Sequence, residues 1–326
     1  MPFVLVLNSS NVTGNYLNNY TYRFTNGSIE IPPNSEMCVS SITLPYSWYN
    51  INQPVYSNGT FQYTLPGPGA TVSTTYTVNF LPGFYQVSDI NNYIQAYMFA
   101  LGQYVLLTGG TIVYFINLLT DQTYYTNQFI LNVVPTSASV ITLYGAGATV
   151  PGNTGSNPYS YPTIQSLPLI IIPANTSANG LTSFGQLIGY SPNTYPVGSV
   201  IPYVPSGVLS TTNRSVNVLG NITPNLTPVN SLIISCNLVD NNITIPSNIL
   251  DSFNINAIFG ANIQYTANFE KMVSLVTGKY QFMTLTLLDQ NGNPIQANDG
   301  NVLITLIIKM GKKELLTYRL SDIGNR

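Results

Sequence analysis

The sequence contains no histidine, only two cysteines and few charged residues. The absence of histidine excludes Ser-His-Asp and Cys-His nucleophilic catalysis, histidine acid–base chemistry and most transition-metal sites. The two cysteines lie far apart in the chain and form no zinc motif, and neither a P-loop nor a glycine-rich dinucleotide fingerprint is present. These absences predict a protein that is not an enzyme and that has no catalytic residue, no cofactor and no metal site.

Charged residues make up 6% of the chain, against roughly 25% in an ordinary globular domain. Hydrophobic residues make up 44%, so the low charge does not indicate disorder, which combines high charge with few apolar groups. Asn, Ser, Thr, Tyr, Gly and Pro take the place of Lys and Glu. Because β-branched and aromatic residues are abundant while strong helix formers are scarce, the composition predicts an all-β fold.

The net charge of −2 gives the surface little electrostatic repulsion between copies. Two interpretations fit this surface: an ordinary soluble protein, or a subunit that functions packed against other subunits, and we favour the second. No Lys or Arg lies between Arg23 and Arg214, and seven of the nine basic residues lie from Lys271 onward. Apolar residues interrupt this basic segment, which is more typical of a solvated face than of a phosphate-binding surface. Nucleic acid is therefore not an expected partner.

No apolar run approaches the length of a membrane span, about 18 uninterrupted residues. The first residues, MPFVLVLNSSN, lack a basic n-region followed by a long apolar h-region, so we expect no signal peptide. Cys38 and Cys236 both lie inside strand-like runs, which predicts buried free thiols. A disulfide between them is the alternative.

Alternating apolar and polar residues predict most of the strands. Asn26-Gly27 separates two such runs, 20–25 and 28–32, and predicts a hairpin. In the next run, EMCVSSITLP, the alternation slips at Ser40-Ser41, which predicts a β-bulge there. Further strands are expected at 60–65 and 72–80, joined by a turn at LPGPGA, and at 111–118, 126–134, 231–239, 261–268, 281–288 and 302–309.

One helix is expected, at about 87–101, with Ser88 as its N-cap. Its apolar residues recur at helical spacing and form one stripe: Ile90, Tyr93, Ile94, Tyr97, Met98 and Leu101. In an all-β chain such a helix is expected to cover the face or the edge of a sheet. Residues 135–229 are rich in Gly, Pro, Asn and Ser and predict a long loop excursion or a small insertion. The expected organisation is a β core made of 1–134 and 230–326, interrupted by 135–229.

Two carboxylates, Asp289 and Asp299, could in principle form an acid/base pair. However, the segment DQNGNP that begins at Asp289 contains the residue types that form turns and cap local N–H groups. The same segment resembles part of a calcium loop, but the acidic residue expected at its end is missing. We therefore predict a hairpin between the strands at 281–288 and 302–309, and no catalytic pair.

Five segments in this order carry a family resemblance: YTYRFTNGSIEIPPNSEMCVSSITLPYSWYNI, FLPGFYQVSDINNYIQAYM, FGQLIGYSPNTYP, SLIISCNLVDN and GKYQFMTLTLLDQNGNPIQANDGNVLITLIIK. In these segments the chain resembles the penton, or minor capsid, proteins of virophages, polinton-like viruses and related large DNA viruses. The resemblance extends over about 20–310 and has no counterpart at about 135–180.

The resemblance implies a single jelly-roll, that is, a β-sandwich of two antiparallel sheets in Greek-key order. It also implies a structural virion protein that assembles as a homopentamer at the five-fold vertices of an icosahedral capsid, inside the host cell. The implied partners are other copies of the chain, the double jelly-roll capsomers of the major capsid protein, and a spike or fibre on the vertex.

Aromatic residues are common anchors of protein interfaces. Tyr46, Trp48 and Tyr49 follow a predicted strand and are candidate contact residues, as are Tyr195 and Tyr203 in the Pro-rich excursion. The alternative for Trp48 is that it fills one end of the sandwich core. An alternative function also remains: a carbohydrate- or receptor-binding β-sandwich of a viral fibre or surface protein would share this composition and these aromatic residues.

Overall fold

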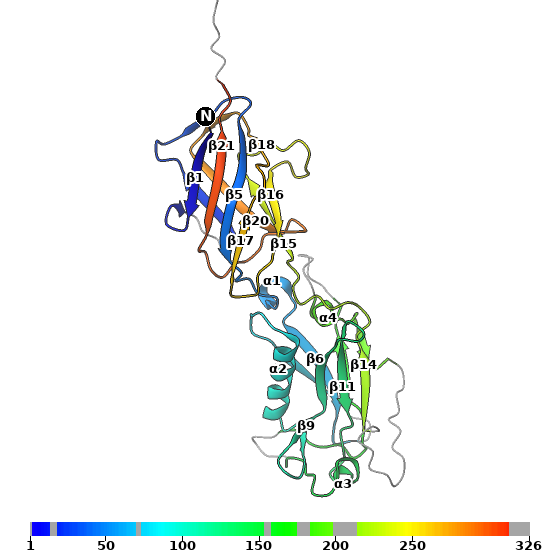
Figure 1. Cartoon of the computed structure of the whole chain (residues 1–326). Coiled ribbons are helices and arrows are strands. Elements are labelled where there is room, and N and C mark those ends of the chain that lie inside the picture. The colour runs from blue at the N-terminus through cyan, green and yellow to red at the C-terminus, as the bar shows by residue number, and fades with distance from the viewer. Residues whose placement is uncertain are drawn as a thin grey trace, which may run out of the picture. The chain divides into compact units, whose positions relative to one another are not determined.

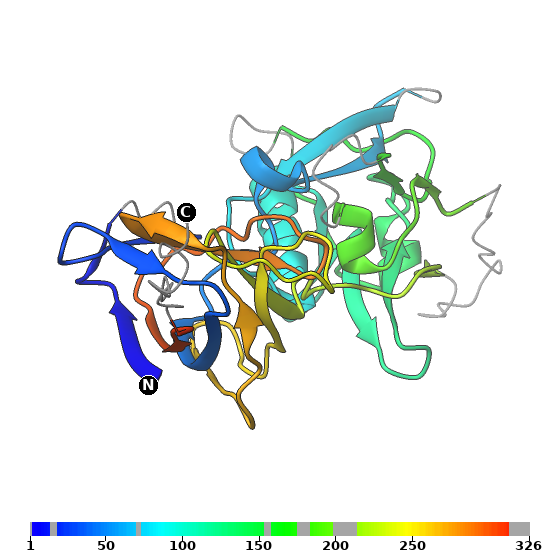
Figure 2. The same cartoon turned by 90° about the horizontal axis from the view of Figure 1, so that it is seen from above.

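The computed structural model describes residues 2–13, 18–69, 73–152, 158–174, 183–197 and 214–312. The chain divides into two compact units. The first unit combines Met1–Trp48 with Val229–Arg326, and the second is Tyr49–Pro228. In Figure 1 the blue start and the orange end of the chain therefore share one unit, while the cyan and green middle forms the other, and the view from above shows the same division (Figure 2).

The first unit consists of strands: β1 (Pro2–Asn8), β2 (Val12–Thr13), β3 (Asn19–Arg23), β4 (Ile29–Ile31), β5 (Glu36–Pro45), β15 (Ser231–Cys236), β16 (Ile249–Asn254), β17 (Asn262–Thr266), β18 (Val273–Ser274), β19 (Gly278–Tyr280), β20 (Phe282–Asp289) and β21 (Leu303–Lys309). One sheet has the order β1-β21-β5-β17, with β18 also paired to β5, and the other has the order β16-β15-β20-β3-β2. Figure 1 shows β21, from the end of the chain, between β1 and β5 from its beginning. Strands β1, β3, β5, β15, β16, β17, β20 and β21 are distributed over the two sheets in the order of a jelly-roll. The predicted all-β jelly-roll is confirmed.

The core of this unit follows from period-2 patterning, because alternate side chains of a strand point to the same face. In β20 the side chains of Met283, Leu285 and Leu287 are buried, and in β21 those of Ile304 and Leu306 are buried. Each of these residues is separated from the next by a less buried one. The alternation therefore determines which face of each sheet packs against the other sheet.

The predicted bulge in β5 is confirmed. Ser41 pairs with Thr305 and Val39 pairs with Leu306, so Ser40 is the extra residue. The bulge keeps Val39 on the buried face with Ile42, although two residues, Ser40 and Ser41, lie between them.

Both predicted hairpins of this unit are wrong. Asn26-Gly27 forms a turn, with the N–H of Gly27 donating to the carbonyl of Phe24, but β3 pairs with β20 whereas β4 pairs with β19. Likewise β20 and β21 belong to different sheets. The reason is the jelly-roll itself, in which successive strands cross from one sheet to the other instead of pairing across the turn.

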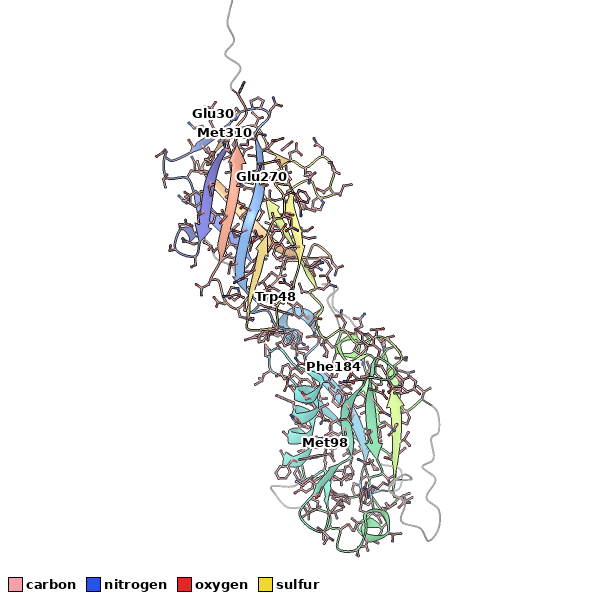
Figure 3. The ribbon with its side chains drawn as sticks, in the orientation of Figure 1. Glu30, Trp48, Met98, Phe184, Glu270 and Met310 are labelled. Atoms are coloured by element: carbon pink, nitrogen blue, oxygen red, sulfur yellow. The ribbon has the colours of Figure 1, made fainter. Side chains whose placement is uncertain are left out.

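The second unit contains α1 (Gln53–Tyr56), β6 (Thr60–Pro66), β7 (Ser73–Asn79), α2 (Val87–Ala100), β8 (Tyr104–Leu106), β9 (Ile112–Tyr114), β10 (Ile116–Asp121), β11 (Thr126–Asn132), α3 (Val140–Tyr144), β12 (Leu169–Ile172), α4 (Phe184–Ile188), β13 (Asn193–Tyr195) and β14 (Ser215–Leu219). Its sheets have the orders β13-β12-β6-β7 and β10-β11-β14, and β8 pairs with β9. The strands expected at 60–65 and 72–80 are present as β6 and β7, and they pair with each other. Side chains from these sheets and from α2 share one core, in which Met98 and Phe184 are buried (Figure 3).

The insertion between β5 and β15 is longer than the expected 135–229, since it begins at Tyr49. Strands at 60–134 that were expected in the jelly-roll belong to the second unit instead. Part of the loop-like excursion completes that unit: β12 pairs with β6, and β14 pairs with β11. Regular alternation shows that a strand has one buried face, but not which sheet buries it.

The helix expected at 87–101 is confirmed as α2, which lies along the edge strand β10. The side chain of Asn91 accepts a hydrogen bond from the N–H of Leu118 at 2.8 Å, and Gln95 donates to Asn117 at 2.8 Å. Its N-cap is Gln86 and not Ser88, because Val87 is already helical. The N–H of Gln86 donates to the carboxylate of Asp89 at 2.9 Å, half of a capping box.

Candidate functional site

The aromatic residues predicted as contacts are mostly interior residues. Tyr46 and Trp48 are buried in the jelly-roll unit, and their ring centroids lie 4.4 Å apart. Tyr49 is half-buried, and Tyr195 in the second unit is buried, with its hydroxyl donating to the carbonyl of Ser191 at 3.0 Å. Tyr203 lies outside the described residues. Burial favours the alternative for Trp48, namely that its indole fills one end of the sandwich core (Figure 3).

The two carboxylates have the turn role that their sequence context indicates. Asp289 is fully buried, and its Oδ1 accepts hydrogen bonds from the N–H groups of Asn291 and Asn293, each at 2.8 Å. Asp299 accepts from the N–H of Asn301 at 2.9 Å. Both side chains are thus engaged by local backbone donors. Within the ranges that the structure describes, no group of three or more Cys, Asp or Glu residues could hold a metal ion.

The two thiols are buried and unpaired with each other, as predicted. Burial raises the pKa of both thiols, that of Cys236 to about 12. Burial thus disfavours the thiolate, which is the nucleophilic form of cysteine, at both positions. Across the described residues, no helix has the length and apolar character needed to cross a membrane.

The first candidate interaction surface is the outer edge of β1, which we call the β1 edge. In the described part of the chain, β1 is the last strand of its sheet and pairs on one side only, with β21. Val4 is 63% exposed and Val6 is 44% exposed, and Phe3 is also exposed. A long, apolar edge strand with unpaired backbone groups is a template for pairing with another chain.

The second candidate interaction surface is formed by loops around β16 and β17, and we call it the β16–β17 flank. Ile243 and Ile245 lie between β15 and β16 and are 94% and 99% exposed. Ile258, between β16 and β17, and Phe269, after β17, are also strongly exposed. Sequence reasoning missed these residues, although the apolar side chains of a short segment such as NNITIP, which lie between two asparagines and a proline, were a usable signal.

These two surfaces lie on opposite sides of the jelly-roll. Strands β1 and β17 are the two ends of one sheet. The hydroxyl of Tyr265 in β17 donates to the carboxylate of Asp251 in β16 at 2.9 Å, so the β16 end of the other sheet lies against the β17 end of the first. The jelly-roll unit therefore presents two different apolar surfaces that point away from each other.

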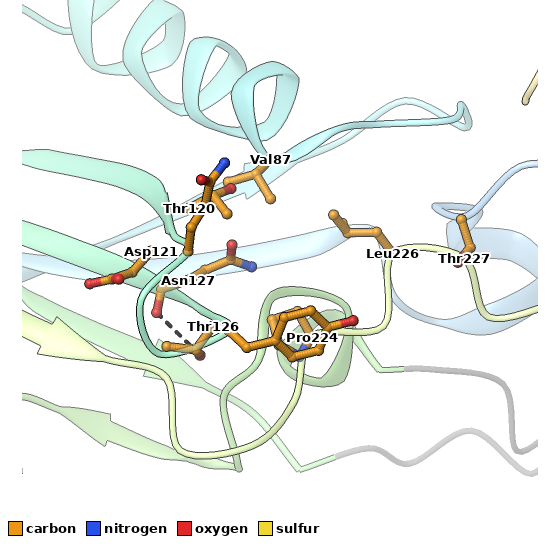
Figure 4. Close-up of a pocket in the computed structure, with 10 residues that line it drawn as sticks. Val87, Thr120, Asp121, Thr126, Asn127, Pro224, Leu226 and Thr227 are labelled. Atoms are coloured by element: carbon orange, nitrogen blue, oxygen red, sulfur yellow. Dashed lines mark hydrogen bonds between the residues drawn. The ribbon is translucent and has the colours of Figure 1, made fainter.

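The second unit has a cavity of 340 Å³ next to the turn between β10 and β11 (Figure 4). Val87, Pro224 and Leu226 supply apolar lining, while Asp121, Gln122 and Asn127 supply polar lining. Tyr125, which is 79% exposed and has a positive φ of 50°, also lines it. An aromatic ring beside carboxylate and amide groups can bind a small polar ligand.

The fold defines a class: an all-β protein with one jelly-roll and a second β-rich unit inserted into it. Among solved structures, the chain is similar to the selenomethionine-labelled mavirus penton protein, with 10% sequence identity and a TM-score of 0.39 over 95% of this chain and 100% of that one. It is also similar to a chain in the cryo-EM structure of the Sputnik virophage, with 11% identity and a TM-score of 0.35 over 94% of this chain and 97% of that one. No protein-family profile and no curated protein matches the sequence.

Proposed function

We propose that this protein is a structural capsid protein that assembles as a ring of five copies at the vertices of an icosahedral virion. The observation that carries the proposal is the pair of unlike apolar surfaces on opposite sides of the jelly-roll, the β1 edge and the β16–β17 flank. A closed cyclic ring is held by heterologous contacts, in which each subunit offers one surface to one neighbour and a different surface to the other.

The composition supports the same proposal. The strongly exposed apolar side chains of the two surfaces are candidate contacts with other subunits. Around them the surface is made of neutral polar groups, since only 6% of the residues are charged. Polar groups of this kind form hydrogen-bonded interfaces without the cost of burying unpaired charges. The ordered segments that resemble penton proteins add the expectation of five-fold symmetry.

In the proposed vertex the ring fills the gap between double jelly-roll capsomers of the major capsid protein, which are then its lateral partners. The inserted second unit is a candidate support for a spike or fibre. The absence of histidine and the turn role of Asp289 and Asp299 agree with a structural function and not a catalytic one. The proposed location is the virion, with assembly inside the host cell.

The test is the mass of the full chain in solution, measured by light scattering at several concentrations. We expect a discrete pentamer, or a monomer that converts to a pentamer as the concentration rises. Replacing Ile243 and Ile245 with Asp is expected to keep the chain monomeric and folded, because the two side chains are almost fully exposed in one subunit. Replacing exposed Leu81 of the second unit with Asp is the matched control. A stable trimer would contradict the vertex position.

The cavity beside Tyr125 supports a second candidate function, the binding of a neutral sugar by the inserted unit. Tyr124 offers a matched control, because it is also exposed but does not line the cavity. We expect Tyr125→Ala to abolish binding on a glycan array and Tyr124→Ala to preserve it. Equal binding by both variants, or no binding by the unsubstituted chain, would contradict this candidate.

A further inference from the structure

The β1 edge is open to the addition of a strand. Within the described residues no strand pairs with the outer side of β1, and the outward-facing Val4 and Val6 are exposed along it. Even Phe3, which pairs with buried Ile308 and so faces the core side, is partly exposed. An additional strand would satisfy the open backbone groups and cover these side chains.

The course of the chain after β21 indicates which segment can supply this strand. Beyond Lys309 the chain turns toward the start of β5: the N–H of Gly311 donates to Ser35 Oγ at 3.0 Å. Ser35 in turn accepts, at its carbonyl, a hydrogen bond of 2.9 Å from the N–H of Leu275, just after β18. A side chain at position 311 would collide with the carbonyl oxygen of Pro33, so glycine permits this close approach.

This exit leads away from the subunit's own β1 edge. In the order β1-β21-β5-β17, the chain leaves β21 on the β5 side, whereas the open edge is on the far side of β1. Met310 also lies at the end of the jelly-roll opposite Trp48, and thus opposite the point where the second unit is inserted (Figure 3). At Gly311 the chain therefore lies toward the side of the sheet that ends in β17 and β18.

The sequence of the C-terminal segment has the pattern of a strand. Residues 313–326 read KELLTYRLSDIGNR, and Leu316, Tyr318 and Leu320 alternate with Thr317 and Arg319. Period-2 alternation is typical of a half-buried strand. At about 3.3 Å per residue, such a segment can extend up to about 46 Å, several times the spacing of neighbouring strands.

We propose that residues 314–320 of one copy add as a strand to the β1 edge of the next copy. The inference deepens the proposed function and rests on it, because it assigns the strand exchange to the contact between neighbours in the ring. The β16–β17 flank of one subunit faces the β1 edge of its neighbour, and the C-terminal segment bridges them. Each subunit donates one strand and accepts one. Every β1 edge is therefore covered only when the ring is closed.

The test uses the full chain with one cysteine at position 4 and another in the C-terminal segment. Because the register of the added strand is open, three double variants are made, in which Val4→Cys is combined with Leu316→Cys, Tyr318→Cys or Leu320→Cys. The native thiols are buried and contribute little background. After mild oxidation at assembling concentration, we expect at least one variant to give a ladder of disulfide-linked multimers on a non-reducing gel.

Two control variants test whether the ladder comes from strand addition at the β1 edge. Moving the first cysteine from Val4 to exposed Leu81 of the second unit is expected to remove it. Adding Val6→Lys to a cross-linking variant is also expected to remove it, because a charged side chain on an edge strand opposes strand addition.

The outcomes separate this inference from the proposed function. A disulfide-linked monomer in place of a ladder would mean that the segment covers its own β1, which overturns the exchange. A full chain that is pentameric by light scattering, with no linkage in any of the three double variants, would overturn the exchange and leave the ring intact. A full chain that stays monomeric and unlinked at every concentration would overturn both.

Discussion

Lys271 Nζ lies 2.9 Å from Asp251 Oδ1, and this ion pair joins the edges of the two jelly-roll sheets. Asp251 belongs to β16 and has a nearly buried side chain, whereas Lys271 follows β17 and is partly exposed. The hydroxyl of Tyr265 donates to the other oxygen of the same carboxylate at 2.9 Å. The carboxylate thus has strong donors from the opposite sheet, and the hydrogen bond from Lys271 to Asp251 raises the pKa of the lysine.

Lys271→Met is expected to lower the free energy of unfolding by about 2 kcal/mol, because it leaves a nearly buried carboxylate without its cation. The matched control is Lys309→Met, which removes the exposed ion pair with Glu36 at 3.4 Å. Exposed pairs contribute little, so the control is expected to lose less than about 1 kcal/mol. Urea titration of both variants provides the comparison, and equal losses would show that burial of Asp251 does not set the strength of the pair.

Asp289→Ala is expected to destabilise the jelly-roll by about 3 kcal/mol, since hydrogen bonds to a buried charged group are among the strongest and their donors would lose their acceptor. The fully buried carboxylate of Asp289 accepts from two backbone N–H groups and from Nδ2 of Asn293 at 3.2 Å. Asp299→Ala is the control, because that side chain is only half-buried, and its loss is expected to stay below about 1 kcal/mol. The urea midpoint measures both, and a larger effect at Asp299 would contradict the turn assignment.

The features of this fold that could be predicted from the sequence are those that neighbouring residues determine. The bulge at Ser40, the helix α2 and the pairing of β6 with β7 were all predictable, because each follows from the spacing of apolar residues and a nearby turn. The turns at Gly27 and after Asp289 were also predictable from their residue types. The residue types of a turn, however, indicate only that the chain reverses there. They do not indicate which sheet the next strand joins, and both hairpin predictions failed for that reason.

The interaction surfaces were less predictable, because exposure is a property of the folded unit. Tyr46 and Trp48 follow the end of β5 and Tyr195 ends the short strand β13. Nothing in the local sequence distinguishes a buried aromatic side chain at such a position from an exposed one. Ile243 and Ile245 are almost fully exposed, whereas apolar residues are generally expected inside. The open side of β1 depends on a strand order that combines the two ends of the chain.

Deletion of Ser40 is expected to preserve the fold. Without this residue Val39 and Ser41 become neighbours, so Met37, Val39, Ile42 and Leu44 fall into a regular alternation with their side chains still on the buried face. The hydrogen bond from the N–H of Ala267 to the carbonyl of Ser40 is lost, at a cost of about 1 kcal/mol.

Deletion of Thr43 is the contrasting variant, because it would make Ile42 and Leu44 adjacent and turn one of them to the outer face. Circular dichroism and the urea midpoint should show a folded protein for the first deletion and loss of cooperative unfolding for the second. A folded Thr43 deletion with an unfolded Ser40 deletion would contradict the bulge assignment.

The stability of the protein is expected to fall steeply on the alkaline side of its pH range. Burial raises the pKa of Tyr20 and of Tyr46 from 10.0 to about 12, and it raises the pKa of Tyr63, Tyr144 and Tyr190 as well. Below pH 10 these hydroxyls are protonated in both the folded and the unfolded chain, so their contribution is complete. As the pH rises toward 12, the unfolded chain loses these protons first, and each buried tyrosine then destabilises the fold by about 1.4 kcal/mol per pH unit.

Between about pH 5 and pH 8 the stability is expected to be nearly constant, because the chain has no histidine to titrate there. Urea unfolding at a series of pH values measures the free energy of unfolding in the neutral and in the alkaline range. Tyrosinate absorbance of the folded protein is recorded at the same pH values. Tyr20→Phe should reduce the alkaline slope while leaving the neutral plateau flat, whereas Tyr124→Phe, at an exposed position, should leave both unchanged. Full ionisation of the tyrosines in the folded chain near pH 10 would contradict the burial on which this prediction depends.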